Sequence, residues 1–77
     1  MIVQVHLFAF LVQYAPGGEA AFTYELTAGA RVSELLRGLG IPASAPRIIL
    51  VNGRHATEDT PLRDGVEVVF MTPIEGG

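Results

Sequence analysis

The sequence predicts a two-layer α+β domain, in which one helix covers one face of a mixed β-sheet of four or five strands. Alternating or β-branched apolar residues, which are typical of strands, occur near both ends of the chain. Between them, one stretch changes to the apolar period of a helix. Of the 77 residues, 49% are hydrophobic and 17% are charged, which argues against intrinsic disorder and fits a single domain.

Two strands are predicted in the first third of the chain. Residues 2–10 are rich in β-branched and aromatic residues. Their alternation places one set on one face, Val3, Val5, Leu7 and Ala9, and a second set on the other, Gln4, His6, Phe8 and Phe10. Residues 14–18 contain a proline and two glycines and are predicted to form a loop. Residues 21–26 alternate again and are expected to return antiparallel as a hairpin.

The apolar period changes after residue 30. Four apolar residues at helical spacing form one stripe: Val32, Leu35, Leu36 and Leu39. Gly38 and Gly40 offer left-handed positions and Pro42 prevents continuation, so a helix of about ten residues ends near them. Its start is poorly signalled, because Ala30 and Arg31 are weak N-caps.

Three further strands are predicted in the second half. Residues 47–51 contain a continuous apolar run, which indicates a strand buried on both faces. Asn52-Gly53 is a tight-turn dipeptide, after which residues 54–56 return as a short edge strand. Residues 57–62 are predicted as a turn or one turn of 3₁₀ helix. Alternation in residues 66–71 directs Val66, Val68 and Phe70 to one face, and Glu67, Val69 and Met71 to the other.

The resulting order of elements, β-β-α-β-(β)-β, is that of the β-grasp fold. Residues 1–71 are predicted to form this domain, and residues 72–77 a flexible C-terminal tail. In a β-grasp sheet the first and last strands are neighbours. The stripe of the helix should therefore cover the inward residues of both strands, Val5, Leu7, Val66, Val68 and Phe70.

The composition excludes several kinds of function. The chain has no cysteine, which removes disulfides, zinc-thiolate sites and a cysteine nucleophile. Five arginines stand against eight acidic residues, a net charge of −3, and form no patch for nucleic acid or a membrane surface. His6 and His55 lack a metal-ligand spacing, so no metal site is predicted. Nothing resembles an export or membrane signal, which makes the cytoplasm the expected location.

The last residues carry the chemistry that the rest of the chain lacks. Pro73 ends strand pairing, and Gly76 and Gly77 follow it. A main-chain carboxylate is ionised at neutral pH and becomes an acyl donor only after activation, for example by ATP as an acyl adenylate. Glycine has no β-carbon, so such a tail can enter a narrow tunnel of a partner. In an extended conformation, residues 72–77 reach about 20 Å beyond the sheet. The alternative to a functional tail is that these residues are only a frayed chain end.

A docking surface is predicted next to this tail. The sheet face opposite the helix would carry Phe8, Phe10, Val69 and Met71, followed in the tail by Pro73 and Ile74. An exposed apolar cluster of this kind marks a site of protein interaction. The alternative is that Phe10 folds under the loop of residues 14–18 and that the other side chains are scattered on the surface.

Four motifs add a family resemblance to this reasoning. They are Leu7-Phe8-Ala9, Val51-Asn52-Gly53, the run Pro61-Leu62-Arg63-Asp64-Gly65-Val66-Glu67-Val68 and the ending Pro73-Ile74-Glu75-Gly76-Gly77. With them the whole chain resembles the MoaD/ThiS family of ubiquitin-like sulfur carriers. The ending is most similar to that of the small subunit of molybdopterin synthase. Thr72 and Val12-Gln13 depart from that branch, and Val51-Asn52-Gly53 suits the thiamine branch equally well, so both branches stay open.

The resemblance implies a role for the tail. Gly77 would be adenylated by an enzyme similar to ubiquitin-activating enzymes, which consumes ATP, and would then become a thiocarboxylate, with Gly76 providing clearance. The thiocarboxylate would donate sulfur to molybdopterin, in a complex with the large subunit of molybdopterin synthase. A tungsten-pterin cofactor is an equal possibility, and in the thiamine branch the partner would be thiazole synthase. The carrier itself would bind no cofactor.

Two interpretations from other classes of protein also stay open. The chain could be a pure interaction module, or a ubiquitin-like modifier that is attached to lysines. An enzyme in its own right is not expected, because the sequence offers no nucleophile, metal set or phosphate-binding loop.

Overall fold

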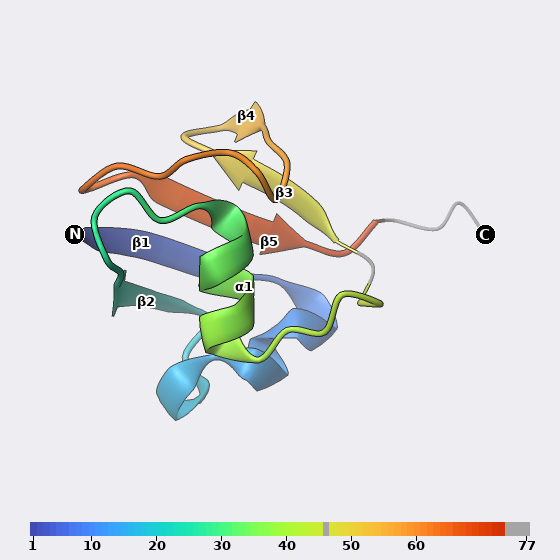
Figure 1. Cartoon of the computed structure of the whole chain (residues 1–77). Coiled ribbons are helices and arrows are strands. Elements are labelled where there is room, and N and C mark those ends of the chain that lie inside the picture. Colours follow the sequence, from blue (N-terminus) through green and yellow to red (C-terminus); the bar gives the residue numbers. More distant parts are fainter. Residues whose placement is uncertain (46, 74–77) are drawn as a thin grey trace.

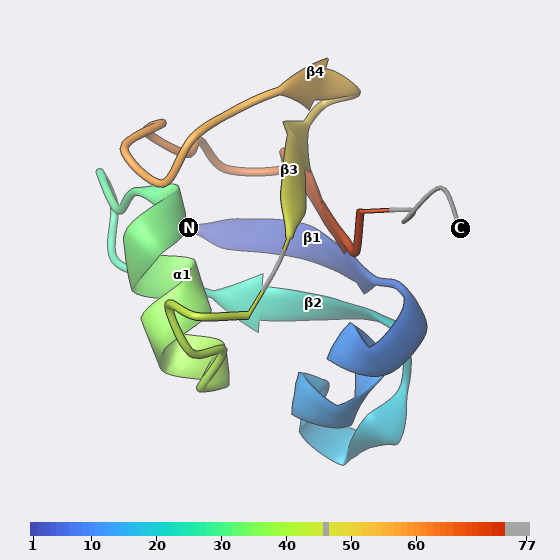
Figure 2. The ribbon, with the colours of Figure 1, turned by 90° about the vertical axis from the view of Figure 1, so that its right-hand side faces the viewer.

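Five strands and one α-helix form the framework of the protein in a computed structural model, which describes residues 1–45 and 47–73. The strands are β1 (Ile2–Leu7), β2 (Ala21–Glu25), β3 (Ile48–Val51), β4 (Arg54–His55) and β5 (Glu67–Met71). The helices are α1 (Val32–Leu39) and two 3₁₀ helices, η1 (Ala9–Tyr14) and η2 (Pro16–Gly18). Figures 1 and 2 show α1 on one side of the sheet.

The strand order confirms the predicted β-grasp fold. The sheet runs β2-β1-β5-β3-β4, so the first and last long strands lie side by side at its centre. β1 and β5 pair in parallel, whereas β2 pairs antiparallel with β1 and β3 antiparallel with β5. The protein is therefore an α+β domain with a mixed five-stranded sheet packed on one main helix.

The hydrophobic core lies between the sheet and α1. The predicted stripe of the helix is buried along its whole length: Val32, Leu35, Leu36 and Leu39. It meets inward side chains of β1 and β5 that are at most 2% exposed: Val3, Val5, Leu7, Val68 and Phe70. Each fully buried side chain of this kind stabilises the fold by about 1.5–3 kcal/mol. The periodicity of the sequence thus assigned the inner face of the sheet correctly.

The chain leaves β1 earlier than its composition predicts. Ala9 has a φ of 55°, a left-handed conformation that costs a non-glycine residue about 1–2 kcal/mol, and the chain turns there into η1. Leu11, inside η1, is completely buried in the core, and this burial offsets the strain. The prediction that Ala9 and Phe10 continue the strand is therefore wrong. The predicted loop of residues 14–18 contains the short helix η2.

Backbone carbonyls of a distant turn cap the start of α1. The Val32 N–H donates to the Thr60 carbonyl oxygen at 3.0 Å, and the Ser33 N–H donates to the Glu58 carbonyl oxygen at 2.9 Å. Arg31, at the N-cap position, makes no side-chain capping bond. The turn therefore replaces the local cap that the sequence lacks. At the other end, Gly40 has a φ of 78° and ends the helix as predicted.

Gly38 lies within α1 and does not provide the left-handed helix end that its sequence position suggested. It instead leaves room for the side chain of Tyr24. A β-carbon added there would lie 2.5 Å from the hydroxyl oxygen of Tyr24 on β2, closer than side chains can approach. We expect Gly38→Ala to destabilise the protein by about 1–2 kcal/mol, because overpacking outweighs a gain in helix propensity of about 1 kcal/mol. Urea unfolding measures the change.

A second variant separates the contact from the helix propensity. In a Tyr24→Phe background the hydroxyl is gone, and the nearest remaining atom, Cζ of the ring, lies 3.3 Å from the added carbon. There Gly38→Ala should be neutral or stabilising, which gives a measurable coupling between the two positions. Equal effects of Gly38→Ala in both backgrounds would show that the Tyr24 hydroxyl does not limit this position.

Candidate functional site

The ends of β1 and β5 lie at the same edge of the sheet, because the two strands run in parallel (Figure 1). Just beyond β1, the Phe8 N–H donates to the Phe70 carbonyl oxygen at 3.1 Å. β3 begins at this edge as well, since Ile48 lies opposite Met71. The chain continues from Met71 through the half-buried Thr72 to the exposed Pro73. The predicted tail therefore starts beside the end of β1 and the beginning of β3.

The sheet face opposite α1 carries apolar side chains at this edge. Val69 on β5 lies opposite both His6 on β1 and Leu50 on β3. The half-buried residues of this face do not belong to the core cluster. We call the whole group the outer patch; its members are His6, Phe8, Ile48, Leu50, Val69 and Met71. The strand register makes the members on β1, β3 and β5 neighbours, and Phe8 joins them through its ring stacked on His6.

Phe8 is the most exposed apolar member of the outer patch, with 39% of its surface accessible. Its ring stacks on the imidazole of His6, with 4.4 Å between the ring centroids and 22° between the ring planes. Stacking of this kind favours one orientation of an exposed aromatic ring, by about 0.5–1.5 kcal/mol for an aromatic pair. Phe8 thus offers a large apolar surface at a low cost in side-chain entropy.

Phe10 lies outside the group that strand pairing brings together. It is 47% exposed and belongs to η1, so the alternation that placed it beside Phe8 does not apply. Its exposure also argues against the alternative that it folds under the loop of residues 14–18. A role of Phe10 in partner binding therefore stays a prediction, separate from the outer patch.

Sequence reasoning missed two members of the outer patch. Ile48 and Leu50 were expected to be buried, because they lie in a continuous apolar run, but both are only half-buried. In β3 only Ile49 is fully buried, on the side of the core. The signal was available in the predicted antiparallel pairing with β5, whose outward residues Val69 and Met71 lie opposite them.

The predicted reactive end of the chain is only partly covered by the structure. Pro73 is described and exposed. Ile74, Gly76 and Gly77 lie outside the described residues, so the roles assigned to them stay predictions. For this part of the chain, the structure describes the edge of the sheet at which the tail begins and the apolar surface next to that edge.

Residues 1–45 and 47–73 hold no candidate metal site and no candidate membrane span. No three His, Asp or Glu side chains of this part gather to hold a metal ion. No helix of the described part is long and apolar enough to cross a membrane. The arrangement can bind a partner, because it presents an apolar surface beside the point at which the predicted tail begins.

The fold and this surface place the protein among the ubiquitin-like β-grasp proteins. SAMP1 from Haloferax volcanii superposes with a TM-score of 0.81 at 21% identity, covering 100% of both chains. Molybdopterin converting factor subunit 1 from Pyrococcus furiosus has a TM-score of 0.77 at 29% identity, covering 95% of this chain and 98% of its own. A chain of the complex of subunits 1 and 2 of molybdopterin-converting factor from Helicobacter pylori has a TM-score of 0.69 at 23% identity, covering 100% of both chains.

The family is assigned by a match between the sequence and a family model. No curated protein matches the sequence. The model of the ThiS family matches residues 5–77, which is nearly the whole chain and includes both final glycines. The chain therefore belongs to the ThiS family, whose small ubiquitin-like members are sulfur carriers and generally not catalysts themselves.

Proposed function

We propose that this protein carries sulfur as a thiocarboxylate on Gly77 and donates it in the synthesis of molybdopterin, for a molybdenum or tungsten cofactor. The observation that carries the proposal is the family match, which runs through Gly76 and Gly77. The 29% identity with molybdopterin converting factor subunit 1 of Pyrococcus furiosus favours the molybdopterin branch. The proposal takes Gly77 to bear the terminal carboxylate of the mature chain.

Two steps load the tail. In an activating enzyme similar to ubiquitin-activating enzymes, the Gly77 carboxylate attacks the α-phosphorus of ATP, and pyrophosphate leaves. Sulfide (HS⁻) then attacks the acyl carbon and AMP leaves with one of the two carboxyl oxygens, so that a thiocarboxylate remains and no redox step is needed. The carrier binds no cofactor of its own and supplies the acyl group, while Gly76 lets it pass a narrow tunnel. The reaction consumes ATP, in keeping with a cytoplasmic location.

The outer patch supports this proposal through its position. It lies at the edge from which the chain continues toward Gly77, so a partner that covers Phe8 and Val69 receives the tail from the same side. The Helicobacter pylori protein forms a complex of subunits 1 and 2. We propose the corresponding large subunit as the second partner of this chain, after the activating enzyme.

Two alternatives have a specific motivation. The family carries the name ThiS, and delivery of sulfur to thiazole synthase in thiamine synthesis would use the same loaded tail. The likeness to SAMP1, described as small archaeal modifier protein 1, motivates a modifier that is joined to other proteins. At 21% identity, this likeness supports the fold and no more.

Mass spectrometry tests the proposal directly. After incubation with the activating enzyme, ATP and a sulfur source, the C-terminal peptide should gain the mass that replacement of one oxygen by sulfur requires, and it should not gain it when ATP is omitted. An unchanged peptide mass would contradict the proposal. Rescue of a molybdopterin auxotroph or of a thiamine auxotroph then separates the two branches, whereas conjugates that survive a denaturing gel would favour the modifier.

A further inference from the structure

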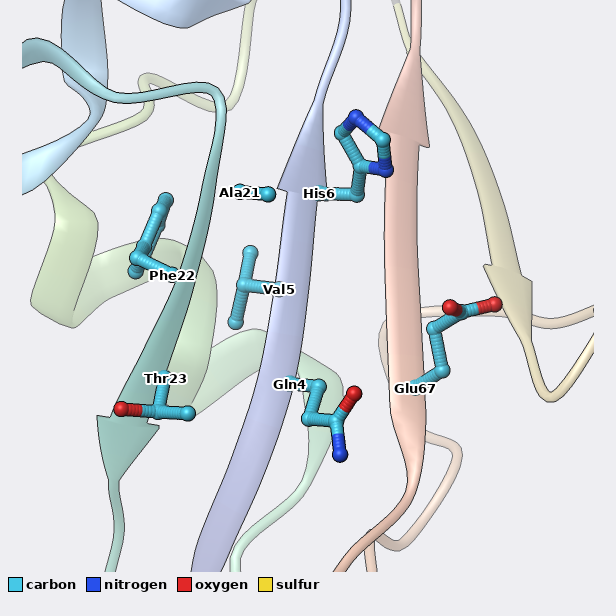
Figure 3. Close-up of a pocket in the computed structure, with 7 residues that line it drawn as sticks. All are labelled: Gln4, Val5, His6, Ala21, Phe22, Thr23 and Glu67. Atoms are coloured by element: carbon cyan, nitrogen blue, oxygen red, sulfur yellow. The ribbon is translucent and has the colours of Figure 1, made fainter.

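The outer face of the sheet has a polar half next to the outer patch. Gln4 on β1 lies opposite Thr23 on β2 and opposite Glu67 on β5, and all three side chains are exposed. With Ala21 and His6 from the next row, they line a shallow depression whose floor includes Val5 and Phe22. Figure 3 shows Thr23, Gln4 and Glu67 side by side on the three strands. The polar half therefore joins the outer patch at His6.

Both backbone polar groups of Glu67 are hydrogen-bonded to Asn52. Its N–H donates to the Asn52 side-chain oxygen at 2.9 Å, and its carbonyl oxygen accepts the Asn52 N–H at 2.8 Å. The residue also lies at the start of β5, next to the fully buried Val68. The carboxylate of Glu67 is thus presented from a rigid base at a defined place on the sheet.

No cation of the described chain neutralises this carboxylate. In residues 1–45 and 47–73 the single ion pair joins Arg47 to Glu58, away from the outer face. The neighbours of Glu67 in the depression contribute a side-chain amide, a hydroxyl and an imidazole. An amide oxygen and a hydroxyl oxygen accept hydrogen bonds, as the carboxylate does. The depression is therefore lined by acceptors that suit a cationic side chain.

We propose that this depression binds an arginine or lysine side chain of the protein that docks on the outer patch. The inference deepens the proposed function, because it rests on a partner covering that patch. The cation pairs with the Glu67 carboxylate and donates to the side-chain oxygen of Gln4 on the neighbouring strand. An arginine fits best, since its planar fork can reach the carboxylate and a neighbouring oxygen together.

The strand register predicts how far the partner's basic side chain lies from the other parts of the interface. Two residues along a strand span about 7 Å, so Glu67 lies about 7 Å from Val69 and about 13 Å from Met71, where β5 ends. The partner should therefore carry its basic side chain about 13 Å from the place where it covers Met71, on the far side of an apolar surface. The basic side chain then fixes the direction in which the carrier lies on its partner.

The ion pair between Glu67 and the partner's basic side chain should contribute more to binding than an ion pair on a free surface contributes to stability. An exposed ion pair is weakened by water and salt, whereas coverage of the outer patch by a partner removes water beside the depression. Complementary charges across an interface chiefly give orientation, specificity and a faster association. The expected signature is thus a loss of affinity that depends on ionic strength.

The test compares Glu67→Gln with Glu34→Gln. Glu34 is exposed on α1, on the opposite side of the sheet, and the two changes remove the same charge. Binding to the activating enzyme of the same organism is measured by calorimetry at about 0.05 M and about 0.5 M salt. Glu67→Gln should weaken binding about tenfold at low salt and only about twofold at high salt, whereas Glu34→Gln should bind like the unchanged protein.

The outcomes separate this inference from the proposed function. Equal affinities of Glu67→Gln and the unchanged protein at both salt concentrations would overturn the cation site, as would an equal loss for Glu34→Gln. Thiocarboxylate formation on the unchanged protein, measured in the same preparation, reports on the proposed function alone. If the unchanged protein neither binds the enzyme nor gains sulfur, both proposals fall.

Discussion

Deletion of Gly77 is expected to slow ATP-dependent activation at least about 100-fold, because misplacement of a reacting group by as little as about 1 Å can have an effect of that size. The shortened chain draws its carboxylate back by one residue, which is about 3.3 Å in an extended tail. The stability of the domain should not change, since the deletion lies beyond β5. Release of pyrophosphate measures the activation rate, and thermal unfolding followed by circular dichroism measures the stability.

Glu75→Ala is the matched control for this deletion. It changes the same tail but keeps its length and both glycines, so activation should proceed at close to the rate of the unchanged protein. Full activity of the chain that lacks Gly77 would remove the proposed mechanism, because the reacting carboxylate would then not need its position at the end of the tail.

Phe8→Ala is expected to weaken binding to the activating enzyme at least about 30-fold, which corresponds to about 2 kcal/mol, as for aromatic residues at the centre of an interface. The reason is the exposure of the ring beside the start of the tail and its fixed orientation on His6. The fold should persist, because the Phe8 ring does not belong to the hydrophobic core. Calorimetric titration with the activating enzyme gives the affinity.

Ile2→Ala provides the comparison for Phe8→Ala. Ile2 is 51% exposed on the same strand, but at the end of β1 that is remote from the tail. Its truncation should change the affinity by less than about twofold, since a contact outside the interface contributes little. Equal losses for Ile2→Ala and Phe8→Ala would show that binding depends on general apolar exposure and not on the outer patch.

The inner face of the sheet could be predicted because burial imposes a strict period on the sequence. Val3, Val5 and Leu7 alternate with polar or exposed residues, and the stripe of α1 follows the helical period. The Asn52-Gly53 turn was equally predictable, since both residues adopt positive φ angles of 50° and 81°, which these two residue types tolerate. In each case the local sequence favours the same backbone conformation that the tertiary structure requires.

The sequence-based predictions were wrong where tertiary contacts determine the local conformation. Residues 8–10 have the composition of a strand, but burial of Leu11 forces a left-handed turn at Ala9 that no alanine propensity would predict. The start of α1 had no local signal, because its caps are the carbonyls of Glu58 and Thr60. For the candidate site, the sequence supplied Phe8, Val69 and Met71 and missed the two outward residues of β3.

The central pairing of β1 with β5 has a consequence for the timing of recognition in the cell. Ribosomes make β1 before β5, so a nascent chain has no complete outer patch until β5 has been released and has packed beside β1. Under the proposed function, a chain without a packed β5 presents only part of the outer patch to the activating enzyme. Under the same proposal, the pairing of β1 with β5 would restrict loading of the tail to molecules in which both strands have packed.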